Sequence, residues 1–437
     1  MKRNSSTQGF GGTAGLVALF FFILQGISFA GVAVSPLQQV VDVKPGKKAT
    51  FSITLTNNKR NSQTSPCPIK MEVLDFAVSD TGQLSFGQEY KNSRSAAEWI
   101  KFPENEFVLT PGESKEMTAT VTAPIDADGD YWAAVMVNLG ESKKGEKGVQ
   151  VNLRTASGVF IRVSRRSYTE RGSVVDTNIV MPDFNAAGDS SKKDMSEQEL
   201  YELKQKQTLK VEAKLKNDGL IAILARGKAS VYTDDWRRVA TIPLHASRRQ
   251  VLPGDSRWFT GVMAQPLPAG KYNLRVFFAS DSTYKRKMTK DVELLICENL
   301  AKVWAKNFVS NDAPSLKFEP QQIELKLNPG RTTASTFQVA NQSLSTIVAD
   351  CRIENGGSNN NWLELRTTDF TLAPNGQHSI TCIAKVPSDA KPGKYEWNIL
   401  VEMEQSGLAG QGRNNVKPYK IPVSVMIDEN ARVIKNK

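Results

Sequence analysis

Short stretches in which apolar and polar residues alternate follow one another along most of this chain. Apolar residues occupy every second position from Ala49 to Leu55, from Ile69 to Val73 and from Met117 to Ala123. An alternation of period two is typical of a β-strand with one buried face. Pro-Gly, Asn-Asn and Asp-Gly pairs, which favour turns, separate these stretches. The pattern therefore predicts an all-β protein, because many short strands with regular turn signals are typical of β-sandwiches.

Two parts of the chain repeat the same residue types at the same spacings. In both copies a Trp stands eight residues before a Phe, and two prolines stand 13 residues apart. Repetition over such a length indicates a duplicated domain rather than a short motif. The matched positions are Trp99, Phe107, Pro111, Pro124 and Tyr131 in the first copy, and Trp362, Phe370, Pro374, Pro387 and Tyr395 in the second.

The alternation and the repeat together predict three tandem immunoglobulin-like β-sandwiches. The first covers residues 31–180 and ends in a long last strand, the second covers residues 208–297, and the third, a repeat of the first, covers residues 316–427. Polar linkers are expected at 181–207 and 298–315, and a polar tail at 428–437. Within the first linker, Ser196 followed by Glu199 forms a capping-box pattern, which predicts a short helix from Ser196 to Lys206.

The first 30 residues have the features of a secretory signal peptide. Lys2 and Arg3 precede a nine-residue apolar core, Leu16 to Leu24, and a small-x-small site ends at Ala30. We therefore expect cleavage after Ala30, a periplasmic, secreted or cell-surface location, and no stable transmembrane anchor. The alternative is an uncleaved anchor. Export also places the cysteines in a compartment where disulfides form.

The first domain carries a set of features in a recognisable order. An opening strand is followed by a Pro-Gly turn, a strand ending at Asn57, the turn Phe107–Gly112 and a strand containing Tyr131-Trp132. A charged loop then leads into the alternating residues around Val159. In these respects residues 31–165 resemble the N-terminal immunoglobulin-like domain of periplasmic pilus-assembly chaperones, and they are similar to related domains of bacterial cell-surface proteins. The resemblance implies a protein that binds another protein without catalysis.

The strand after the charged loop is the predicted partner-binding element. Val149, Val151 and Leu153 would project to one face, and an edge strand can pair its free backbone groups with a guest strand. Pilus chaperones anchor a carboxylate with an Arg on the first strand and a Lys on the last. Here Val32–Val41 contains neither, and Phe160 stands near the position of the Lys. Arg162 is close by and is the remaining candidate partner-binding residue. The alternative is that this strand only completes the first sandwich.

Positive charge is concentrated in the middle domain. Residues 207–296 carry a net charge of +8, whereas residues 31–141 carry −4. One interpretation is a face that binds anionic envelope polysaccharide or lipid, and the other is a set of solvated strand ends that prevent edge pairing. Nucleic acid is not an expected partner of an exported protein that lacks an aromatic and basic groove. The candidate anion-binding residues are Arg237, Arg238, Arg248, Arg249, Lys285, Arg286 and Lys287.

The sequence contains few residues that could form a catalytic site. His245 and His378 are the two histidines of the chain, and neither has a recognisable nucleophile and acid at catalytic spacing. We therefore predict no enzyme activity, no cofactor and no metal site. Cys351 and Cys382 both fall at inward-facing positions of the third domain, which predicts an intradomain disulfide, with two buried thiols as the alternative. The function expected is a non-enzymatic binding protein for an envelope or surface protein, with a chaperone-like or surface-scaffold role.

Overall fold

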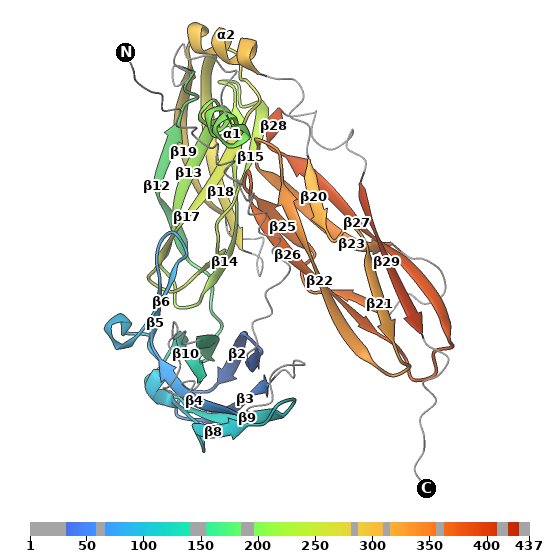
Figure 1. The fold of residues 1–437 in the computed structure, drawn as a ribbon. Helices are drawn as coiled ribbons and strands as arrows, with labels where there is room; N and C mark the ends of the chain where they lie inside the picture. Colours follow the sequence, from blue (N-terminus) through green and yellow to red (C-terminus); the bar gives the residue numbers. More distant parts are fainter. Residues whose placement is uncertain are drawn as a thin grey trace, which may run out of the picture.

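The computed structural model describes residues 32–57, 66–139, 154–184, 196–280, 287–308, 315–354, 362–408 and 418–427. These residues form three β-sandwiches, the first in blue, the second in green and yellow, and the third in orange and red in Figure 1. The all-β prediction is thereby confirmed. Residues 1–30, the predicted signal peptide, and the predicted edge Val149–Leu153 lie outside the described residues. No helix within the described ranges has the length and apolar character needed to cross a membrane.

The first sandwich packs a four-stranded sheet, β1-β3-β9-β7, against a five-stranded sheet, β2-β11-β10-β4-β8. Its core follows the sequence alternation, since Phe51, Ile53 and Leu55 of β3 are all buried. A hairpin, β5-β6, extends from β4, and two short 3₁₀ helices follow it. The strands are β1 Val32–Ser35, β2 Gln38–Val43, β3 Lys48–Asn57, β4 Cys67–Leu74, β5 Phe76–Val78, β6 Leu84–Phe86, β7 Ile100–Lys101, β8 Glu106–Leu109, β9 Ser114–Thr122, β10 Gly129–Leu139 and β11 Arg154–Val163, with η1 Gln88–Tyr90 and η2 Ala97–Trp99.

The third sandwich has the same strand order as the first. Its sheets run β20-β22-β26-β24 and β21-β29-β27-β23-β25. The predicted repeat pairs also coincide in space, because the Trp99 and Tyr131 rings lie 4.4 Å apart and the Trp362 and Tyr395 rings 4.5 Å. The repeat predicted from the spacings is therefore a repeat of structure. The strands are β20 Leu316–Glu319, β21 Ile323–Leu327, β22 Thr332–Asn341, β23 Ile347–Glu354, β24 Leu363–Leu365, β25 Asp369–Leu372, β26 Gln377–Lys385, β27 Gly393–Gln405, β28 Gly407–Leu408 and β29 Tyr419–Ile427.

The second sandwich begins earlier than the sequence analysis predicts. Strand β12, assigned above to the first domain, pairs with β13 in a three-stranded sheet, β12-β13-β17. The first domain therefore ends with β11 at Val163. Alternation identifies a strand but not the sheet that it joins, which explains the error. The elements are β12 Gly172–Val180, α1 Glu197–Lys206, β13 Leu209–Asn217, β14 Ile223–Tyr232, β15 Arg238–Leu244, β16 Gln250–Val251, β17 Ser256–Met263, β18 Gly270–Ser280, β19 Lys287–Ile296 and α2 Glu298–Asn307.

Two helices flank the second sandwich, and Figure 1 shows both near its upper end. Helix α1 begins as predicted, since the Ser196 hydroxyl accepts a hydrogen bond from the Glu199 N–H and the Glu199 carboxylate accepts one from the Ser196 N–H. This reciprocal pair satisfies two N–H groups that would otherwise have no partner at the helix start. Helix α2 lies within the second predicted linker, residues 298–315.

The first two sandwiches are joined by an apolar cluster and by the β5-β6 hairpin. Phe76, Trp132 and Ala134 of the first domain bury their side chains against Leu252 of the second. Beyond them, the hairpin tip bonds to β17, where the Trp258 N–H donates to the Asp80 carbonyl at 2.9 Å. Residues of the two domains therefore share both buried surface and backbone hydrogen bonds.

The third sandwich is attached to the second through backbone pairing. Strand β28 adds to the edge of β15, which extends the second domain's larger sheet to β19-β18-β14-β15-β28. Nearby, the Thr346 N–H donates to the Val262 carbonyl at 3.0 Å, and the Val262 N–H donates to the Thr346 hydroxyl at 2.9 Å. The third domain thus covers a sheet edge that would otherwise be open.

The disulfide predicted between Cys351 and Cys382 is absent, because both are free thiols in the structure. Their inward orientation is as predicted, since both are buried in the core of the third domain. However, Cys351 lies on β23 and Cys382 on β26, which belong to opposite sheets. A disulfide also needs its two Cα atoms within roughly 4.4–6.8 Å of each other, and inward-facing positions on two strands do not by themselves meet that condition. Burial raises the pKa of Cys351 to about 12 and that of Cys382 to about 11, so both remain protonated.

Candidate functional site

The last strand of the first domain, β11, has one half of its outer edge open. Strand β2 covers that edge only from Gly158 to Val163, while β10 covers the opposite edge along the whole strand. The Gly158 N–H donates outward to the Leu37 carbonyl at 2.9 Å. Because backbone groups alternate in direction along a strand, the N–H and C=O of Ala156 and Arg154 point to the same side. Within the described ranges, no strand pairs with them there.

The third domain presents the equivalent edge in a different chemical form. Strand β21 pairs with β29 from Val423 onward, which places Pro422 at the position of Gly158 and Lys420 at that of Ala156. Pro418, just before β29, then matches Arg154. Two of the three outward donor positions are therefore prolines, which have no N–H. The spacings of the repeat reveal this difference once the two last strands are aligned.

The side chain of Arg162 is occupied within the molecule. Its Nε and Nη2 donate to the two carboxylate oxygens of Asp130 at 2.7 and 2.9 Å. The hydrogen bonds that Arg162 donates to Asp130 raise the pKa of the guanidinium. Asp130 is buried, and it also accepts a hydrogen bond from the Ala222 N–H of the second domain at 2.7 Å. Arg162, predicted as a partner-binding residue, therefore lies at the junction of two domains.

A cleft of about 410 Å³ lies beyond the covered half of β11, and all three domains contribute to it. Gln38 and Phe160 come from the first domain, Arg249 from the second and Phe370 from the third. Phe160 is three residues from Ser157, where the open half of β11 ends, so the cleft adjoins the edge. Sequence reasoning did not identify this cleft, because its walls are brought together only by domain packing.

Both histidines of the chain line this cleft. The His378 ring stacks on Phe370 with centroids 4.8 Å apart, and its Nε2 has no hydrogen-bond partner among the described residues. Burial lowers the pKa of both His245 and His378, with a further decrease for each from Arg249. Neutral imidazoles are therefore favoured here. Across the part of the chain that the structure describes, no three His, Cys, Asp or Glu side chains gather as metal ligands would.

The candidate anion-binding residues do not form one surface. Arg237 and Arg238 are exposed around the start of β15. Through the cross-strand pairs of β15 with β14, β14 with β18 and β18 with β19, Arg238 lies in the same row of the sheet as Glu293 of β19. Lys287 begins β19, six residues away, which corresponds to roughly 20 Å along a strand. Arg248 and Arg249 line the cleft instead, and Arg249 lies 3.8 Å from Asp369 of the third domain. Lys285 and Arg286 lie outside the described residues.

Comparison with known proteins finds neither a matching family model nor a matching curated sequence. Solved structures do match. A class 5 fimbriae chaperone, CfaA, is 12% identical with a TM-score of 0.33, and the Escherichia coli chaperone DraB is 14% identical with a TM-score of 0.27. The complex of Salmonella enterica SafA pilin with the SafB chaperone contains a further match, at 10% identity and a TM-score of 0.28. Each match covers 61% of this chain and 97% or more of the other. The predicted resemblance to pilus chaperones is thus confirmed, and likeness at this level concerns the fold alone.

Proposed function

We propose that this protein binds an extended segment of another exported polypeptide along the open half of β11. The observation that carries the proposal is the pair of outward-facing backbone groups at Arg154 and Ala156, next to the point where β2 ends. A guest strand would satisfy these groups and continue the sheet. Val149, Val151 and Leu153, which precede β11 in the chain, would lengthen the same pairing surface and contribute apolar side chains to it. The role is non-enzymatic and chaperone-like.

The contrast between the two copies of the domain supports one binding edge rather than two. Proline at an outward donor position prevents strand addition, and natural proteins use it to protect sheet edges. The third domain has Pro418 and Pro422 at such positions, whereas the first has Arg154 and Gly158. The third domain would then serve to support the second, whose β15 edge is already covered by β28.

The occupation of Arg162 by Asp130 supports recognition through the backbone rather than through a captured carboxylate. A bidentate pair fixes the direction of the guanidinium, so a ligand carboxylate that needed the same Nε–Nη2 face of Arg162 would have to displace Asp130. Specificity would then depend on the side chains that the guest strand places on either face of the sheet.

The proposal is tested with Ala156→Pro, which removes the outward donor and leaves the hydrogen bonds to β10 in place. Lys420→Pro makes the same change on the third domain and serves as the matched control. Each immobilised protein is incubated with an envelope extract from cells that produce it, and bound proteins are compared by mass spectrometry. Proteins retained by the wild type and by Lys420→Pro, but lost with Ala156→Pro, are the expected result. Equal retention by all three folded proteins would rule out the edge.

A further inference from the structure

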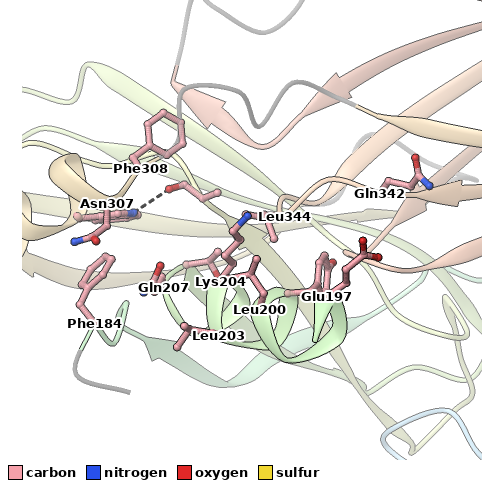
Figure 2. Close-up of a pocket in the computed structure, with 14 residues that line it drawn as sticks. Phe184, Glu197, Leu200, Leu203, Lys204, Gln207, Asn307, Phe308, Gln342 and Leu344 are labelled. Atoms are coloured by element: carbon pink, nitrogen blue, oxygen red, sulfur yellow. Dashed lines mark hydrogen bonds between the residues drawn. The ribbon is translucent and has the colours of Figure 1, made fainter. Parts of the chain in front are cut away.

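A second cavity with substantial apolar lining lies between α1, α2 and the third domain. It has a volume of about 380 Å³, within the usual range for small-molecule sites. Figure 2 shows it above α1, with Phe184 and Phe308 toward one end and Glu197 toward the other. It shares no lining residue with the three-domain cleft.

The walls of this cavity are mostly apolar and are held from several directions. Leu203 and Trp304 are buried beneath it, and the Trp304 indole N–H donates to the Ala264 carbonyl at 2.8 Å. On the third-domain side, the loop carrying Leu344 is tied to α1, since the Gln205 amide donates to the Leu344 carbonyl at 3.4 Å. A cavity lined by apolar side chains with a few polar groups is typical of small-molecule sites, in which the apolar part of a ligand is buried.

A single cation stands among these apolar walls. Lys204 lies on the same face of α1 as Leu200, one turn further along, and Figure 2 shows its side chain rising from the helix toward Leu344. No described carboxylate lies within ion-pairing distance of it. A lysine can lay its carbon chain along an apolar wall and present its ammonium group at the rim. Glu197, the acidic residue of the lining, is seven residues away, which is about 10 Å along a helix.

From this arrangement we propose that the cavity binds a single acyl chain with an acidic head group. The chain would occupy the space bounded by Leu200, Leu203 and Trp304, and the carboxylate would accept hydrogen bonds from the Lys204 ammonium. The cavity volume favours one chain over a diacyl lipid, and the position of Lys204 favours an anionic head over a cationic one. This binding is independent of the strand pairing proposed for β11.

The test measures binding of dodecanoate to the mature protein by isothermal titration calorimetry, below the concentration at which the ligand aggregates. Dodecylamine has the same chain with a cationic head and serves as the comparison ligand. We expect saturable binding of one dodecanoate per protein and binding of dodecylamine at least about tenfold weaker, in keeping with the loss of a charge-assisted hydrogen bond. Absence of saturable dodecanoate binding, or equal affinity for the two ligands, would overturn the proposal.

Two variants of α1 separate a specific role of Lys204 from general attraction to a basic helix. Lys204→Gln removes the cation in the cavity, and Lys206→Gln removes an exposed cation two residues away that does not line it. Lys204→Gln should weaken dodecanoate binding by about tenfold, whereas Lys206→Gln should change it by less than about twofold, because exposed charges are screened. Leu344→Trp, which fills the cavity from the loop, should abolish binding in a protein that still unfolds cooperatively. Equal effects of the two lysine variants would also overturn the assignment.

Discussion

Arg162 on β11 and Asp130 on β10 form a bidentate ion pair, with N–O distances of 2.7 and 2.9 Å, and Asp130 also accepts the N–H of Ala222 from the second domain. One carboxylate therefore fixes the direction of an Arg on the covered half of β11 and joins two domains. The two residues are opposite each other in the β10–β11 ladder, so the strand register itself brings them together.

The first prediction concerns this carboxylate. Asp130→Ala leaves the Arg162 charge and the Ala222 N–H without their partner, and breaking a buried pair costs about 3–5 kcal/mol. Because the Arg162 side chain is 37% exposed, we expect a smaller loss of about 2 kcal/mol in the free energy of unfolding. Urea denaturation measures it, with Asp126→Ala, at an exposed position of the preceding turn, as the control. Equal stability of the two variants would contradict the role given to Asp130.

The second prediction concerns the cysteines. Cys351 and Cys382 are buried thiols with raised pKa values of about 12 and about 11, whereas Cys297 is exposed. Since the thiolate is the reactive form, iodoacetamide at pH 8 should modify Cys297 within minutes and the other two only after denaturation. Peptide mapping without reduction gives the answer. A Cys351–Cys382 peptide pair linked through sulfur would show that the thiol assignment is wrong.

A third prediction follows from the cleft histidines. Burial lowers the pKa of His245 and His378 in the folded protein, so the unfolded chain, with a His pKa of about 6.5, takes up protons more readily. The stability that the neutral rings contribute is fully present above about pH 6.5. It is lost as the pH falls from there through the pKa values that the two rings have in the folded protein. Protonation would also add positive charge beside Arg249, which lies 3.8 Å from Asp369.

The measurement compares the wild type with His245→Gln/His378→Gln by urea unfolding at pH 7.5 and 5.5. The wild type should lose more stability between these two pH values than the double variant does. Carboxylates that titrate in the same range affect both proteins equally and cancel in the comparison. An identical loss in both proteins would show that the two rings do not control this dependence.

Alternation along the chain predicts most of the strands, and the spacing of residues such as Trp99 and Trp362 predicts that the third sandwich repeats the first. The same information cannot assign β12 to its sheet, because alternation describes one strand and not its neighbour. Inward parity places Cys351 and Cys382 in one core, but it does not give the separation between opposite sheets. The three-domain cleft and the cavity beside Lys204 exist only where domains and helices pack together, so no local pattern predicts them. Pro418 and Pro422, in contrast, are readable from the sequence once the repeat is aligned through to its last strand.

The central claim is that a partner strand pairs with β11, and amide hydrogen exchange tests it most directly. The N–H groups of Arg154 and Ala156 point away from β10, whereas that of Thr155 points toward it, so only the first two should gain protection when a captured partner binds. We predict slower exchange at Arg154 and Ala156 with the partner present, and unchanged exchange at Lys420 of the third domain. Unchanged exchange at Arg154 and Ala156, with new protection confined to β15 beside Arg237 and Arg238, would contradict the account and favour binding at these two arginines of the second domain instead.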